Sequence, residues 1–330
     1  MNNITDDELK KIPYLGNMPN DGRLVLIRFF YDHKQNEWFA FHKKPNDEIL
    51  IIKPSDLVIG SYISERPASI NDFEFPLGTF ICKYLSFPDL INPLVSLEND
   101  FRNFSSILEK YIIMSTTDSE SHKTAQLIET ELEYLIILSR SVYDLLQKIS
   151  KHATSIVKSF DESHSRLIED LPESFARITF SGNISRTSEQ LISRYNLPSA
   201  LAEFYVNEAT LFQKIRDLRI AIEHHGKSPE DIIYKLEEGF AVEISQEPWG
   251  DLNIWGNESI KNNNLGSLRL IFLYVIHEIL EMTNRYVQAY ASCVQVQSCF
   301  SGDYKLYLRN HYSHHLVNLG KDLMQPWEQS

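Results

Sequence analysis

Residues 198–226 decide the fold of this 330-residue chain, and they read PSALAEFYVNEATLFQKIRDLRIAIEHHG. Apolar side chains recur every three or four residues along this stretch, the spacing that places them on one face of an α-helix. Ser199 follows a proline and belongs to the residue types that cap helix N-termini, and Gly226 is typical of the position just beyond a helix C-terminus. The stretch therefore predicts a long helix that buries one face.

The same apolar spacing continues elsewhere in the C-terminal region. It predicts long helices over about residues 121–160 and 265–297, a shorter helix over 229–238 and a last short helix over 304–319. Residues 239–264 are interpreted as a strand-like excursion followed by a polar loop. Because short and medium connections place successive helices side by side, we expect these helices to form an antiparallel bundle.

The N-terminal region follows a different pattern. β-branched and aromatic runs at residues 24–31 and 38–42 flank the polar residues 32–37, which predicts a hairpin, and residues 49–52 supply a third strand. Prolines interrupt residues 61–97, so this segment is interpreted as a connector with one more strand around 79–85. We therefore expect an α+β protein, mainly helical, with a small β-rich unit at 1–95 and a helical bundle at 96–330.

Composition excludes several classes of protein. With 43% hydrophobic and 23% charged residues, the chain is expected to fold around a sizeable core, and a net charge of −13 disfavours polyanions and acidic membranes. Three cysteines without metal-ligand spacing favour reduced thiols over a disulfide framework. The polar N-terminus lacks a signal-peptide pattern, and the most apolar stretch, 268–280, is too short to span a bilayer. We expect a cytoplasmic protein without a membrane partner.

The strongest candidate site lies at the end of the helix predicted over 198–226. Arg219 is followed by His224 and His225, which lie about 140° and 120° from it around an ideal helix. The histidines therefore reach the face of the arginine only where the helix ends or bends, and Gly226 predicts such an end. Arginine offers a permanent positive charge and histidine a pKa near neutrality.

This segment resembles the HEPN superfamily, all-helical domains in which an arginine is followed, after four to six residues, by a histidine. The resemblance covers the motif and, loosely, residues 120–320. It implies metal-independent endoribonuclease activity, toxin-like or defence-related, in a homodimer whose two motifs face each other. Arg219 would stabilise the transition state, and His224, with His225 as substitute, would act as general acid or base. One position departs from the pattern, because Ile220 stands where many active members carry Asn or Asp.

Two other histidine groups carry weaker patterns. His311 and His315 are one helical turn apart and could share a metal ion, but no further ligand is spaced to complete the site, and packing against Tyr312 or Trp327 is the competing interpretation. The segment from His277 to Glu281 begins like a zinc-protease helix but has a glutamate where the second histidine must stand. It could still supply polar groups beside Arg219 if the two helices pack together. We expect no metal ion and no cofactor.

Alternatives to the nuclease remain open. Phosphate-binding loops, dinucleotide fingerprints and the hydrolase nucleophile elbow are absent from the sequence. Aromatic and basic residues of the hairpin, from Arg28 to Lys44, either stack single-stranded nucleic acid or form the core and rim of a sheet. Trp249 and Trp255 either cap the bundle or form a recognition surface. The second functional hypothesis is a non-catalytic helical module that dimerises or binds a partner protein, in which Arg219 and His224 are structural.

Overall fold

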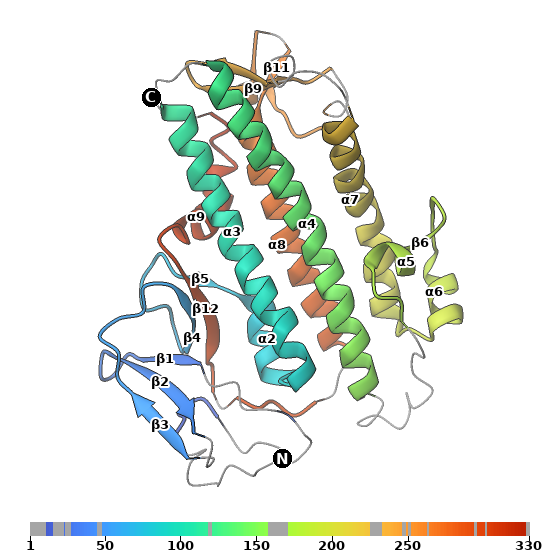
Figure 1. The fold of residues 1–330 in the computed structure, drawn as a ribbon. Coiled ribbons are helices and arrows are strands. Elements are labelled where there is room, and N and C mark those ends of the chain that lie inside the picture. Colours follow the sequence, from blue (N-terminus) through green and yellow to red (C-terminus); the bar gives the residue numbers. More distant parts are fainter. Residues whose placement is uncertain are drawn as a thin grey trace.

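The computed structural model describes residues 11–15, 23, 28–44, 48–117, 121–157, 171–224, 233–245, 249, 252–262, 264–293, 296–300 and 302–327. The protein is α+β, and helices make up most of it (Figure 1). The α-helices are α2 (Pro76–Tyr84), α3 (Ile91–Thr116), α4 (Ser121–Val157), α5 (Phe175–Thr179), α6 (Ser188–Tyr195), α7 (Ser199–His224), α8 (Leu268–Ala291) and α9 (His314–Asp322), with 3-10 turns at Pro88–Leu90 and Asn257–Ser259.

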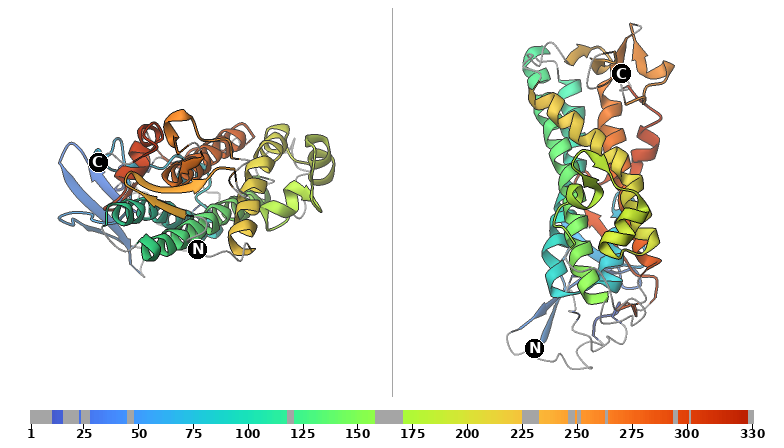
Figure 2. Two further views of the ribbon diagram at one scale, coloured as in Figure 1. Left: turned by 90° about the horizontal axis from the view of Figure 1, so that it is seen from above. Right: turned by 90° about the vertical axis from the view of Figure 1, so that its right-hand side faces the viewer.

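Four long helices, α3, α4, α7 and α8, run side by side along the length of the molecule (Figures 1 and 2). Helix α8 is the most apolar of them, and its buried residues include Ile271, Val275 and Ile279. Such a helix is stable only when other elements cover most of its surface. Helix α8 packs against α3, α4 and α7, and 12 of its 24 residues are buried, so it lies in the interior of the helical region.

A six-stranded sheet lies at one end of the helices. It contains strands from both the N-terminal and the C-terminal region of the described chain. Its strands follow the order β3-β2-β1-β4-β12-β5. The bounds are β1 (Phe29–Asp32), β2 (Glu37–Lys43), β3 (Ile49–Ile52), β4 (Gly60–Ser64), β5 (Phe73–Glu74) and β12 (Lys305–Arg309). Strand β12 pairs antiparallel with β4, where Leu306 lies opposite Ile63, and with β5 on its other side. A strand from the C-terminal region thus completes a sheet that otherwise comes from residues 29–74.

Sheet and helices share one hydrophobic core, which includes Phe30 and Ile63 of the sheet together with Leu97 of α3. At this junction a buried ion pair also links the two parts. Arg28, just before β1, donates a hydrogen bond of 2.6 Å to Glu98 on α3, and Ser61 on β4 donates one of 2.8 Å to the other carboxylate oxygen. The guanidinium of Arg28 additionally donates to Ser61 at 2.7 Å. Burial of this pair makes the junction specific, because either charge alone would be strongly destabilising there.

The described residues also form two smaller sheets. One has the order β10-β11-β9-β8, and the other pairs β6 with β7. Their strands are β6 (Phe180–Ser181), β7 (Ile184–Ser185), β8 (Ile233–Leu236), β9 (Gly239–Glu243), β10 (Ile260–Lys261) and β11 (Leu265–Ser267). The four-stranded sheet contacts α8 and covers the end of the helices at which α7 finishes (Figure 1).

The hairpin of β1 and β2, the third strand at 49–52 and the long helices α4, α7 and α8 confirm the corresponding sequence predictions. Four predictions were wrong. The segment 61–97, interpreted as a connector with one strand, contains most of β4, strand β5, helix α2 and the start of α3. Residues 79–85 fall largely in helix α2, residues 233–236 form strand β8 where a helix was expected, and residues 305–309 form strand β12 where the last helix was expected to begin. Helix α3 passes through residue 95, and the division into units at 1–95 and 96–330 stays a prediction.

Candidate functional site

Arg219 lies in the last part of α7, which ends at His224 as the sequence predicts. The arginine is half-buried, and its neighbour Ile220 is 44% exposed. For His224 the structure describes the backbone alone, and His225 lies outside the described residues. The structure therefore places the motif at the end of a long helix, while the approach of guanidinium and imidazole stays a prediction.

Helices α7 and α8 run antiparallel, and a partly buried ion pair fixes their register (Figure 1). Glu208 on α7 is 2% exposed and accepts hydrogen bonds of 2.6 Å and 3.2 Å from Nε and Nη2 of Arg285 on α8. This bidentate contact supplies the positive charge that a buried carboxylate needs. It also holds the arginine side chain in place. The hydrogen bond to Glu208 is the largest cause of the raised pKa of Arg285.

Arg219 belongs to the same face of α7 as Glu208. The two residues are eleven positions apart, which on an α-helix leaves them only about 20° apart around the axis. Between them on that face, Phe212 and Ile215 are each 2% exposed. Arg219 therefore lies on the face of α7 that carries Glu208, about three turns further along the helix.

Helix α8 carries further polar groups on the N-terminal side of Arg285. His277 lies with Nδ1 3.9 Å from Glu278, and Arg285 reaches Glu278 at 3.8 Å. The pKa of the Tyr274 hydroxyl is raised, chiefly by burial and then by the negative charge of Glu278. The sequence suggested that His277 and its neighbours could lie beside Arg219 if their helices packed together, and α7 does pack against α8. Glu278 thus links His277 and Arg285 into one polar group on α8, and the contact of Arg285 with Glu208 joins this group to α7.

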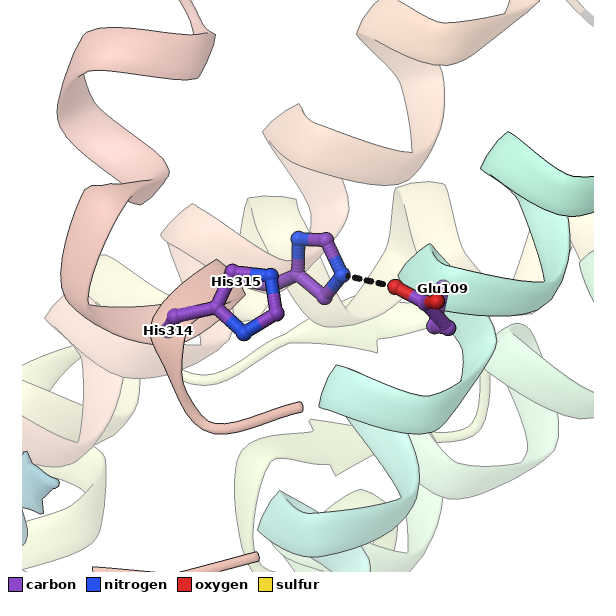
Figure 3. Close-up of side chains that lie close together, drawn as sticks. All are labelled: Glu109, His314 and His315. Atoms are coloured by element: carbon purple, nitrogen blue, oxygen red, sulfur yellow. Dashed lines mark hydrogen bonds and ion pairs between the residues drawn. The ribbon is translucent and has the colours of Figure 1, made fainter. Parts of the chain in front are cut away.

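A second cluster joins α3 and α9 (Figure 3). The Nε2 atom of His315 is 2.7 Å from a carboxylate oxygen of Glu109, and the rings of His314 and His315 have centroids 4.0 Å apart. One potential ligand atom from each of the three residues lies within 4.8 Å of the other two. Sequence reasoning paired His315 with His311, which is exposed, and found no further ligand. Glu109 escaped notice because it is 206 residues away in the chain.

The aromatic residues singled out in the sequence serve packing. Phe30, Trp38 and Phe41 are buried in the sheet, which supports the interpretation of the hairpin as a core and its rim. Trp249 is 2% exposed, and Trp255 donates a hydrogen bond of 3.0 Å to the carbonyl oxygen of Ser267. Both tryptophans therefore cover the end of the helices.

The chain matches no protein-family model, no curated protein and no solved structure. Among the helices of the described residues, none combines the length and the apolarity required to cross a membrane. The assignment of a function consequently rests on the residues and their geometry alone.

Proposed function

We propose that the protein is a metal-independent endoribonuclease of the HEPN type that acts as a homodimer. The observation that carries the proposal is the position of Arg219 and His224 in the last turn and a half of α7. Helical spacing keeps His224 about 140° from Arg219 around the axis. The proposal therefore requires His225, which follows the last residue of α7, or a bend at the end of α7 to bring an imidazole to the guanidinium. The long packed helices α3, α4, α7 and α8 serve as the HEPN-like antiparallel bundle in this proposal.

The proposed reaction needs no cofactor. The 2′-hydroxyl of a ribose attacks the adjacent phosphorus, the bond to the 5′-oxygen of the next nucleotide breaks, and a 2′,3′-cyclic phosphate remains. One imidazole accepts the proton of the 2′-hydroxyl, and a second group returns a proton to the leaving oxygen. The guanidinium of Arg219 stabilises the negative charge that develops on the phosphoryl oxygens. Two motifs facing each other across a homodimer supply both proton-transfer groups.

Two further features bear on this proposal. With a net charge of −13, the protein relies on local positive charge at the site to hold RNA, and affinity is expected to fall as salt concentration rises. No disulfide joins Cys82, Cys293 and Cys299, which supports a reducing, cytoplasmic location.

The decisive experiment measures cleavage of a mixed RNA pool in EDTA by the wild-type protein, Arg219→Ala and the double variant His224→Ala, His225→Ala. Arg194→Ala serves as the matched control, because Arg194 is an exposed arginine of the neighbouring helix α6. We expect cleavage by the wild type and the control only, with circular dichroism showing that all variants are folded. Equal inactivity of all four proteins would reject the nuclease and favour the second hypothesis, a dimerising module that binds a partner protein.

A further inference from the structure

The cluster of Glu109, His314 and His315 has the composition of a metal site. Its groups come from α3 and from the first turn of α9, and Figure 3 shows the ring of His315 pointing at the carboxylate of Glu109, with the ring of His314 beside it. His315 is the deepest member, with 7% of its side chain exposed, whereas Glu109 retains 27%. One side of the cluster is therefore buried and the other remains open to solvent, so that an ion could enter.

Each histidine can offer a ring nitrogen to a metal ion. A metal ion binds the lone pair of an imidazole nitrogen, and one nitrogen of each ring lies within 4.8 Å of a carboxylate oxygen of Glu109.

We propose that Glu109, His314 and His315 bind a divalent transition metal ion, with Zn²⁺ the best fit to the ligand set. Two imidazole nitrogens and one carboxylate oxygen, with water in a fourth position, are a common tetrahedral arrangement for this ion. The absence of thiolates in the cluster disfavours softer ions, and the two nitrogens disfavour Mg²⁺ and Ca²⁺, which prefer oxygen ligands.

The distances require only a small adjustment. Metal–ligand bonds of about 2.0–2.1 Å in a tetrahedron separate the ligand atoms by roughly 3.3 Å. The atoms of the cluster now lie within 4.8 Å of one another, and the hydrogen bond between His315 and Glu109 spans 2.7 Å. Side-chain rotation of His314, together with a slight opening of the His315–Glu109 contact, brings all three atoms into range. Zn²⁺ then replaces the proton that this hydrogen bond shares.

The ion would act as a structural cross-link. Glu109 belongs to α3, and both histidines belong to α9, which follows β12 after only four residues. A bound ion would therefore fix α9 against α3 and help to keep β12 in its place within the sheet. This role is independent of the proposed nuclease, whose chemistry requires no metal.

The test is a titration of the full-length protein, freed of metals with EDTA and dialysed, first with Zn²⁺ by calorimetry and then with Co²⁺ by absorption spectroscopy. Variants Glu109→Gln and His314→Gln remove one ligand each while avoiding the buried His315. His311→Gln is the matched control, since His311 is an exposed histidine three residues before His314.

We expect the wild type and His311→Gln to bind Zn²⁺ equally, to show the visible absorption bands of tetrahedral Co²⁺, and to unfold at a temperature a few degrees higher with Zn²⁺. Glu109→Gln and His314→Gln should each bind at least about tenfold more weakly and lose the Co²⁺ bands. The proposal is overturned if the wild type shows no such bands. It is equally overturned if neither variant weakens binding relative to His311→Gln, because the ion would then be held elsewhere.

Discussion

Arg309 on β12 donates two hydrogen bonds, of 2.9 Å and 3.1 Å, to the carboxylate of Asp72, which precedes it by 237 residues. The same guanidinium lies over the ring of Trp38 on β2, 4.9 Å from the ring centroid, and also reaches Asp56 at 3.0 Å. One side chain thus connects β12 to three earlier segments of the chain. The planar fork of arginine suits this arrangement, because it can pair with a carboxylate in its plane and stack on an aromatic ring with its face.

Replacement of Arg309 by lysine tests this connection. Lysine retains the charge but loses the bidentate contact with Asp72 and the stacking on Trp38, so we expect Arg309→Lys to lower the free energy of unfolding by about 1–3 kcal/mol. Urea denaturation monitored by tryptophan fluorescence measures the change. Lys305→Arg, a substitution at the other end of the same strand, is the control and should alter stability little. If Arg309→Lys leaves the free energy of unfolding unchanged, strand pairing alone holds β12 in the sheet.

The buried pair of Arg28 and Glu98 predicts strong coupling between two substitutions. Glu98→Gln leaves a buried guanidinium without its countercharge and should cost about 3–5 kcal/mol, and Arg28→Met should cost a similar amount. The double variant Arg28→Met, Glu98→Gln removes both charges and should be more stable than either single variant. A double-mutant cycle from urea denaturation gives the coupling energy, and additive effects would contradict the prediction.

Asp100 on α3 predicts a pH dependence of stability. Burial raises the pKa of this carboxyl group to about 6, and its Oδ2 atom is buried without a hydrogen-bond partner among the described residues. The folded protein therefore binds a proton more readily than the unfolded chain, so this group adds stability as the pH falls from above 6 towards 4. At pH 7.5 the ionised group is unfavourable.

We accordingly expect Asp100→Asn to be more stable than the wild type at pH 7.5, by of the order of 1 kcal/mol after allowance for partial solvent screening. The difference should shrink towards pH 4.5, where the wild-type carboxyl group is protonated. Thermal unfolding of both proteins across this pH range measures it. A difference that does not change with pH would show that the folded-state pKa is ordinary.

Subunit complementation tests whether the proposed nuclease site is shared across a homodimer. Arg219→Ala is expected to cleave RNA roughly 10²–10³ times more slowly, and the double variant His224→Ala, His225→Ala should lose a comparable factor. When the two inactive proteins are mixed, dimers form that contain one intact arginine and intact histidines on opposite subunits. Recovery of part of the activity would support a shared site, whereas no recovery despite subunit exchange would confine each site to one subunit.

Sequence periodicity predicted helices α4, α7 and α8, because each of them carries apolar residues every three or four positions, but it missed α3, whose first residues were assigned to a connector. Helix α7 even ends where Gly226 predicts an end, at His224. The errors arose in segments whose local secondary-structure preference differs from the structure that contacts with distant segments impose. Helix α2 contains Thr79, Phe80 and Ile81, which favour strands in isolation, and the proline at its first position was the overlooked signal of a helix start.

Strand β12 and the Glu109–His314–His315 cluster share a different cause of failure. The apolar residues Leu306 and Leu308 fit a short helix or a strand equally well, and only the partners on β4 and β5, more than 200 residues earlier, decide between them. In the same way, no residue close to His315 in the sequence indicates that Glu109 lies beside it. Patterns within a window of sequence cannot reveal contacts that tertiary structure creates.

The place of β12 between β4 and β5 also constrains how the protein folds during synthesis. Until residues 305–309 have left the ribosome, one edge of β4 and one edge of β5 lack the partner that they have in the folded protein. Such open edges are templates for pairing with other chains. The sheet therefore stays incomplete while most of the chain is translated, and its open edges are exposed to aggregation during that time.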